Sequence, residues 1–107
     1  MPLIEGAGEF DAPPGEVSYV EQLRTDDLSV GTYSLAAGAV DRQSPHTEDE
    51  VYVVTGGRAT FVDDSGRVEV GSGDVLFVRA GVAHHFEHVT ANLGLVVVFG
   101  PAEGSRR

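Results

Sequence analysis

Short runs of apolar residues, several of them alternating with polar ones, recur along the whole chain. In Arg67-Val68-Glu69-Val70 each charged residue is followed by a valine, the period of a half-buried β-strand. The pattern predicts seven or eight short strands and few helical turns. The strand-like runs cover residues 16–23, 28–35, 50–54, 58–64, 67–70, 74–78, 84–90 and 93–100.

Turn-forming residues separate these runs. Asp63-Asp64-Ser65-Gly66 lies between two of them and predicts a hairpin. Other breaks carry glycine pairs or Asp-rich stretches, and the glycines at 38, 57, 73 and 81 fall where a turn needs a permissive backbone. Short strands at this spacing predict an all-β sandwich or barrel.

The same pattern divides the chain into three parts. Residues 1–15 contain two prolines with flanking glycines and predict an irregular N-terminal leader. Residues 16–101 hold all the strand-like runs and form the barrel. Residues 102–107 are polar and predict a short C-terminal tail. With 107 residues in total, the chain is the size of one domain.

The charge balance narrows the choice of partners. Seven basic residues stand against 17 acidic ones, a formal net charge of −10. Such a chain is repelled by phosphate backbones and anionic lipid, so we expect neither nucleic acid nor membrane as a partner. Cations and neutral small molecules fit better, although solubility alone would also explain the acidity.

Cysteine is absent, which excludes disulfides, thiolate metal sites and cysteine nucleophiles. The N-terminal residues show no signal-peptide pattern, and no apolar run reaches the length of a membrane span. We therefore expect a cytoplasmic protein.

The four histidines are the strongest transition-metal ligands available. His84, His85 and His88 lie close together, and His46 precedes an acidic cluster that includes Glu50. Neutral imidazole combined with carboxylate suits divalent Fe, Mn, Ni, Cu or Zn. The other interpretation is that His46 and Glu50 belong only to a polar loop that leads into a strand.

Distances limit which of these residues can share one metal. Two ligands of a metal lie within about 4 Å of each other, whereas His46 and Glu50 on a straight strand would be about 13 Å apart. A shared metal therefore requires a turn or bulge at residues 47–49, or a helical segment. The run at 51–57 opposes a helix, so we predict a turn. By the same reasoning at most one of His84 and His88 is a ligand, while His85 points to the opposite face.

Two spaced motifs resemble those of the small single-domain cupins, which are RmlC-like jelly-roll β-barrels. The first runs from Gly38 through Ser44-Pro45-His46 and Glu50 to Gly57. The second runs from Gly73 through Arg79-Ala80-Gly81 and His84 to His88. Every spacing fits, with three substitutions: Ser44 replaces the first histidine of the family motif, Arg79 a proline and His88 an asparagine. The resemblance covers residues 28–100.

The resemblance implies one divalent transition metal held by His46, Glu50 and His84. Ser44 stands at the position of the family's fourth ligand, and a serine hydroxyl is a poor donor. We therefore expect water there, or the amide of Gln43. Two histidines and one carboxylate leave three positions open on an octahedral metal.

Other residues carry secondary expectations. Glu50 or His88, if free of the metal, are candidate general bases, and His88 is expected to line the pocket. Tyr52 is either a core aromatic residue or points its hydroxyl into the pocket. Glu48 and Asp49 are expected to be solvated turn residues, and Asp41 with Arg42 a surface pair.

Two functions remain open. The chain can be a metal-dependent enzyme acting on a small organic molecule, a dioxygenase with Fe or an isomerase, cyclase or lyase with Zn, Mn or Ni. Alternatively it is a non-catalytic small-ligand-binding cupin with a structural metal or none. We also expect a homodimer formed through unpaired strand edges, with residues 16–23 and 93–99 as the candidate edges.

Overall fold

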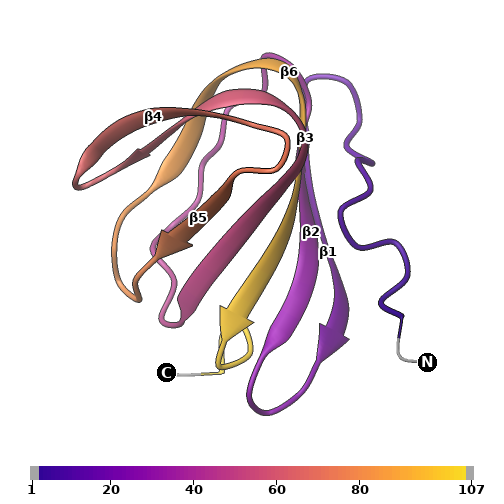
Figure 1. Ribbon diagram of the computed structural model, residues 1–107, viewed down its shortest axis with the longest axis vertical. Helices are drawn as coiled ribbons and strands as arrows, with labels where there is room; N and C mark the ends of the chain where they lie inside the picture. The colour runs from indigo at the N-terminus through magenta and orange to yellow at the C-terminus, as the bar shows by residue number, and fades with distance from the viewer. Residues whose placement is uncertain (1–2, 106–107) are drawn as a thin grey trace.

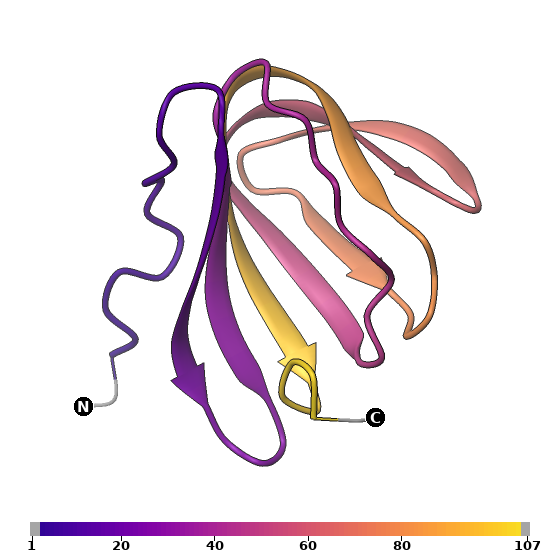
Figure 2. The same cartoon turned by 180° about the vertical axis from the view of Figure 1, so that it is seen from behind.

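The computed structural model describes residues 3–105, in which six strands form one antiparallel, strongly curved sheet (Figures 1 and 2). The sheet order is β1-β2-β6-β3-β4, and β5 pairs with β3. No helix in this part of the chain could cross a lipid bilayer. The predicted all-β class is confirmed. The strands are β1 (Val17–Arg24), β2 (Ser29–Leu35), β3 (Asp49–Asp63), β4 (Gly66–Gly71), β5 (Val75–Val78) and β6 (His85–Gly100).

The two longest strands correct the predicted boundaries. Runs 50–54 and 58–64 form the single strand β3, and runs 84–90 and 93–100 form β6. The strands β3 and β6 pair with each other from Asp49↔Gly100 to Val62↔His85. The register shifts between residues 54 and 60 of β3. These irregularities bend the strands without ending them. The bend curls the sheet, so that both ends of β3 help enclose one interior.

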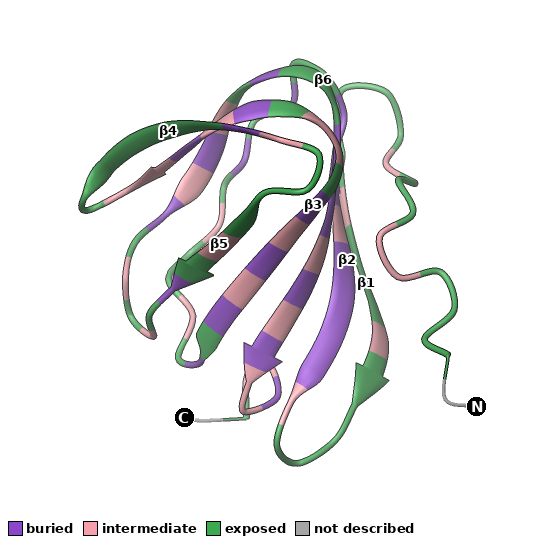
Figure 3. Ribbon diagram, viewed as in Figure 1, coloured by how far each residue is buried: buried purple, intermediate pink, exposed green. Residues whose placement is uncertain are grey.

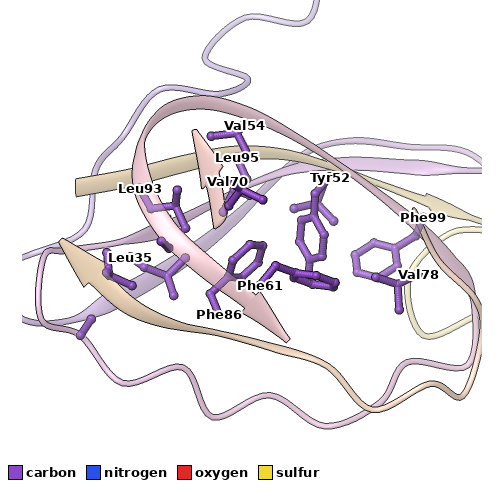
Figure 4. Packing of buried hydrophobic residues seen from close by; sticks show 14 residues of the cluster. Leu35, Tyr52, Val54, Phe61, Val70, Val78, Phe86, Leu93, Leu95 and Phe99 are labelled. Atoms are coloured by element: carbon purple, nitrogen blue, oxygen red, sulfur yellow. The ribbon is translucent and has the colours of Figure 1, made fainter. Parts of the chain in front are cut away.

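The core lies inside the curve of the sheet. Along the first part of β3 and the last part of β6 buried residues alternate with more exposed ones, as expected for strands with one face inward (Figure 3). Leu, Val and aromatic side chains from these strands, β2 and β4 pack together in this interior (Figure 4). The predicted hairpin is present, with Asp63 paired to Gly66.

The N-terminal residues are irregular, but they pack along the sheet. Gly8 N donates to Thr32 Oγ1 at 2.8 Å, and Thr55 Oγ1 donates to Gly8 O at 2.7 Å. Asp11 N donates to Ser34 Oγ at 3.2 Å. The leader therefore covers the outer face of β2, which explains why almost every residue of that strand is buried.

Of the two predicted free edges of the sheet, the one at residues 93–99 is wrong. Residues 93–99 belong to β6, which lies between β2 and β3 and has no free edge there. The continuous Leu-Val run is instead that of a central strand. Residues 17–24 form β1, which ends the sheet order and has a partner on one side only among residues 3–105.

The C-terminal residues, predicted to form only a polar tail, make contacts with the barrel. Ala102 is buried, and Glu103 N donates to Ser29 Oγ at 2.9 Å. Arg24 donates to the carbonyl oxygen of Glu103 at 2.6 Å, and Gly104 N donates to Glu48 Oε1 at 2.9 Å. Residues 102–104 are therefore fixed against the barrel, while 106 and 107 lie outside the described residues.

A surface carboxylate gives this fold a testable pH dependence. His85 Nε2 lies 2.9 Å from Glu87 Oε1, and Arg67 pairs with the other oxygen. The hydrogen bond with His85, then the one from Arg67, hold the pKa of Glu87 below its usual value. A lowered folded-state pKa means that the stabilisation exists above the unfolded-state pKa and is lost as the pH falls through the folded value.

We therefore expect the melting temperature of the wild type to fall slightly more than that of Glu87→Gln between about pH 5 and pH 3. Thermal melts across this range measure the effect. Glu69→Gln, which alters another exposed carboxylate of the sheet, should follow the wild type. Parallel curves for the wild type and Glu87→Gln would contradict the prediction.

Candidate metal centre

His46, Glu50 and His84 come together inside the barrel. One ligand atom from each lies within 4.8 Å of the others. Glu50 is the second residue of β3, and a bend at Thr47 and Glu48 returns His46 towards it, where a turn was predicted. Glu50 also pairs with Val78 of β5, and the loop after β5 leads back to His84.

His84 is held from both sides of its ring. Its Nδ1 lies 2.9 Å from the carbonyl oxygen of Val82, and its Nε2 lies 3.1 Å from Glu50 Oε1. Because a carbonyl only accepts, Nδ1 carries a proton. In the neutral ring, Nε2 then presents a lone pair towards Glu50.

This arrangement places two acceptors face to face in a buried site. Glu50 is 2% exposed, and its Oε1 has no hydrogen bond of good geometry among the described residues. Unsatisfied buried oxygens are costly. Burial lowers the pKa of His84, but the close carboxylate of Glu50, the hydrogen bond to the carbonyl of Val82 and the charge of Asp41 raise it more, to a net increase. A proton on Nε2 satisfies the pair, and so does a metal cation.

The donor set therefore fits a divalent transition metal. Two imidazoles and a carboxylate are the ligands of mononuclear Fe, Mn, Ni, Cu and Zn sites. The ring of His46 packs edge to face against Phe99, with centroids 4.8 Å apart. This contact helps to orient the imidazole towards Glu50 and His84.

Tyr52 is a core aromatic residue and also points its hydroxyl towards the site, so both of its predicted roles are present. The side chain is 1% exposed and packs against Phe61 and Phe86. Its hydroxyl lies 3.2 Å from both His84 Nε2 and Gln43 Oε1. Burial, then the charge of Glu50, raises the pKa of Tyr52 well above its ordinary value, so the hydroxyl remains a proton donor beside the site.

A cavity of about 220 Å³ opens beside these residues. Gln43 reaches it, whereas the exposed Ser44 does not. Of the two side chains considered for the fourth ligand position, Gln43 is therefore the one placed at the site. The residues that line the cavity are Tyr19, Tyr33, Gln43, His46, Glu50, Tyr52, Val97, Phe99 and Glu103.

His88 does not line this cavity, and the prediction of its position is wrong. The residue has φ of +52° and is exposed on the surface. It lies where β6 shifts register against β3, between the pairs Thr60↔Glu87 and Arg58↔Ala91. A bulge of this kind breaks the alternation that would have placed His84, Phe86 and His88 on one face.

Of the two acidic residues expected in a solvated turn, only one is exposed. Glu48 is 1% exposed and accepts from Thr47 Oγ1 and Gly104 N, so it anchors the C-terminal segment and is not a solvated turn residue. Asp49 is exposed, as expected, and accepts from Ala80 N at 2.9 Å.

Asp41, expected to form a surface pair with Arg42, is buried and supports the site instead. It is 9% exposed and accepts from Tyr33 Oη, Phe86 N and Gln43 Nε2, the last two at 2.8 and 2.7 Å. It thereby orients Gln43 towards Tyr52. The one signal in the sequence was its spacing of two residues from Gln43, which places both on one side of an extended segment.

Comparison with known proteins agrees with this fold. The family model described as "Cupin domain" matches residues 31–99. An uncharacterized protein of Streptomyces coelicolor is 42% identical over 95 residues, which cover 89% of this chain and 90% of that protein.

Solved structures of low sequence identity share the fold. An RmlC-like cupin from Shewanella frigidimarina has a TM-score of 0.73 at 21% identity, covering 92% of this chain and 86% of that one. KdgF from a Halomonas species has a TM-score of 0.73 at 20% identity, covering 85% and 84%. The DMSP lyase DddQ of Ruegeria pomeroyi has a TM-score of 0.73 at 19% identity, but the match covers 78% of this chain and 46% of that one.

Proposed function

The chain belongs to the cupin family, and we propose that it is an enzyme that acts on a small organic molecule at one divalent transition metal. His46, Glu50 and His84 would hold the metal. The observation that carries the proposal is the buried oxygen of Glu50, 3.1 Å from His84 Nε2 and without a hydrogen bond. A bound metal would supply Lewis-acid polarisation, or dioxygen activation if it is iron.

The residues around the triad suit work on a bound molecule. Tyr52 offers a hydroxyl that stays protonated, and Gln43 an amide, both beside the cavity. Val97 and Phe99 supply an apolar wall that limits water around the ligand. With a volume of about 220 Å³, the cavity favours a small substrate. DddQ, named as a lyase, has the same fold, which is compatible with lyase chemistry without selecting it.

The alternative is a non-catalytic cupin that binds a small ligand. Ser44 favours this function, because it replaces an imidazole of the family motif and is exposed. A structural metal would be hard to exchange, and its removal would unfold the protein, whereas a catalytic one leaves exchangeable positions.

Metal analysis tests the proposal. We would strip the protein, reload it separately with Fe, Mn, Ni, Zn or Cu, and measure the bound metal. About one equivalent per chain is expected in the wild type and in His85→Ala, a histidine that contacts Glu87 instead. His46→Ala should lose the metal. A folded wild type that binds none of the five, or a His46→Ala variant that binds normally, would exclude this centre.

We also propose that two copies associate through β1. Its outer side has no strand partner among the described residues, and Val17, Val20 and Leu23 are each more than one-third exposed. Unpaired edges of this kind favour strand pairing. Light scattering should give twice the chain mass of 11.3 kDa, and a single species at the chain mass would contradict the dimer.

A further inference from the structure

The cavity beside the triad has aromatic walls and negative charge. Of the nine residues that line it, four are aromatic and two are glutamates, and none is Lys or Arg. The arginines whose placement is described, Arg24, Arg42, Arg58, Arg67 and Arg79, are all exposed. A site that binds an anionic group normally has the guanidinium of Arg or the ammonium of Lys in its lining. The lining of this cavity instead carries the carboxylates of Glu50 and Glu103.

Two tyrosines form the outer part of the cavity. Tyr19 of β1 pairs with Tyr33 of β2, and their rings meet edge to face with centroids 6.4 Å apart. Tyr19 is 40% exposed, so its ring lies at the opening. Gly31 makes this position available, because a Cβ there would lie 2.2 Å from the Tyr19 hydroxyl. Asp41 holds the hydroxyl of Tyr33.

Glu103 brings a carboxylate to the same opening. Its backbone is fixed by Ser29 and Arg24, at N and O respectively. Its side-chain carboxylate interacts electrostatically with the exposed Arg24 but forms no salt bridge with it among residues 3–105, so it is available to a ligand. The carboxylate lies near the phenol of Tyr19: after burial and Glu21, the charge of Glu103 helps to raise the pKa of Tyr19.

We propose that this cavity selects small organic cations, with an alkylammonium head against Tyr19 and Tyr33 and its charge balanced by Glu103. Aromatic faces attract such cations through their quadrupole, and a nearby carboxylate adds a direct charge interaction. A polar group at the other end of the molecule would face Glu50 and His46. This last part rests on the proposed metal function, whereas recognition of the head does not.

Two probes of equal shape test the selection. Choline carries a quaternary ammonium and a hydroxyl, and 3,3-dimethylbutan-1-ol replaces the nitrogen with carbon. By calorimetry on the metal-loaded protein we expect choline to bind at least about fivefold more tightly than the alcohol. Glu103→Gln should weaken choline by about fivefold and leave the alcohol unchanged. Glu69→Gln, at an exposed carboxylate outside the cavity, should not alter either.

A second variant addresses the aromatic wall. Tyr19→Leu keeps an apolar side chain but removes the ring, and we expect a loss of choline affinity of about threefold to tenfold. Tyr19 is on an edge strand and partly exposed, so this change should leave the fold intact, which a thermal melt checks. Glu103→Lys should abolish the preference for choline over the alcohol.

Several outcomes would overturn the inference. These are equal binding of the two probes, absence of choline binding at millimolar concentration, or an unchanged choline affinity in Glu103→Gln. The metal content of the same samples separates the two proposals. Bound metal without selection for choline removes this inference and leaves the metal centre. Selection for choline that persists in metal-free protein supports the inference even if the metal proposal fails.

Discussion

Glu50→Gln is expected to lose the metal and at the same time to make the metal-free protein more stable. The carboxylate is a ligand of the proposed centre, and a neutral amide is a much weaker one, so metal affinity should fall by about 100-fold or more. In the metal-free protein, however, the amide can donate a hydrogen bond to His84 Nε2 where the carboxylate oxygen has none.

The expected gain in stability follows from the cost of the unsatisfied oxygen. Replacing two opposed acceptors by a donor and an acceptor is worth about 1 kcal/mol, or about 5 °C in the melting temperature of a domain this size. Thermal melts of metal-free wild type and Glu50→Gln measure this gain at alkaline pH, above the raised pKa of His84, because a protonated His84 would itself satisfy the carboxylate. Added metal should raise the melting temperature of the wild type but not of the variant, because only a ligand that binds the folded state stabilises it.

Two controls make the result specific. Glu50→Ala removes the ligand without supplying a donor and leaves a small void, so it should lose the metal and also lose stability. Glu69→Gln, at an exposed position of β4, should change neither property. If Glu50→Gln bound metal like the wild type, or melted lower than the wild type without metal at alkaline pH, where His84 is neutral, the account of this centre would be wrong.

Gly57→Ala is expected to disrupt folding, because a side chain has no room at the bend of β3. Gly57 has φ of +95°, a region that L-residues rarely adopt. A Cβ built there would lie 2.2 Å from the carbonyl oxygen of Asn92 and 2.7 Å from the Cα of Leu93. These are backbone atoms of the paired strand β6, so the clash cannot be relieved by a side-chain rotation.

Gly73→Ala separates strain from steric exclusion. Gly73 has nearly the same φ, +92°, but nothing lies within 4 Å of a Cβ built on it. We expect a cost of about 1–2 kcal/mol for Gly73→Ala, from backbone strain alone. Gly57→Ala should cost at least about 3 kcal/mol, since movement of the paired strand is added to the same strain. Urea unfolding of both variants gives the comparison, and equal losses would contradict the role assigned to the bend.

The resemblance of the two motifs to those of cupins was sufficient to predict which residues meet at the centre. The turn between His46 and Glu50 follows from a distance argument alone, because two ligands of one metal cannot lie on a straight strand four residues apart. The alternation of apolar residues was likewise enough for the all-β class and for the hairpin at residues 63–66, since both depend on local spacing and turn chemistry.

Local pattern failed where long-range pairing decides the position of a residue. His88 was placed on the face of His84 by alternation, but a bulge against β3 turns it outward. Residues 93–99 were taken for an edge, although they are flanked on both sides by distant strands. A bulge and a strand order depend on contacts with residues far away in the sequence, which no local period records.

By itself, then, the sequence determined the class of fold and, through the family resemblance, the three candidate ligands, because the strand pattern and the family motifs rest on residue types at short, fixed spacings. Only the tertiary structure placed Asp41 behind Gln43, buried Glu48 and brought Glu103 from the C-terminal segment to the cavity. The physical reason is that an acidic residue is expected to be exposed to solvent unless hydrogen-bond partners allow its burial. The partners here come from strands and loops far apart in the chain.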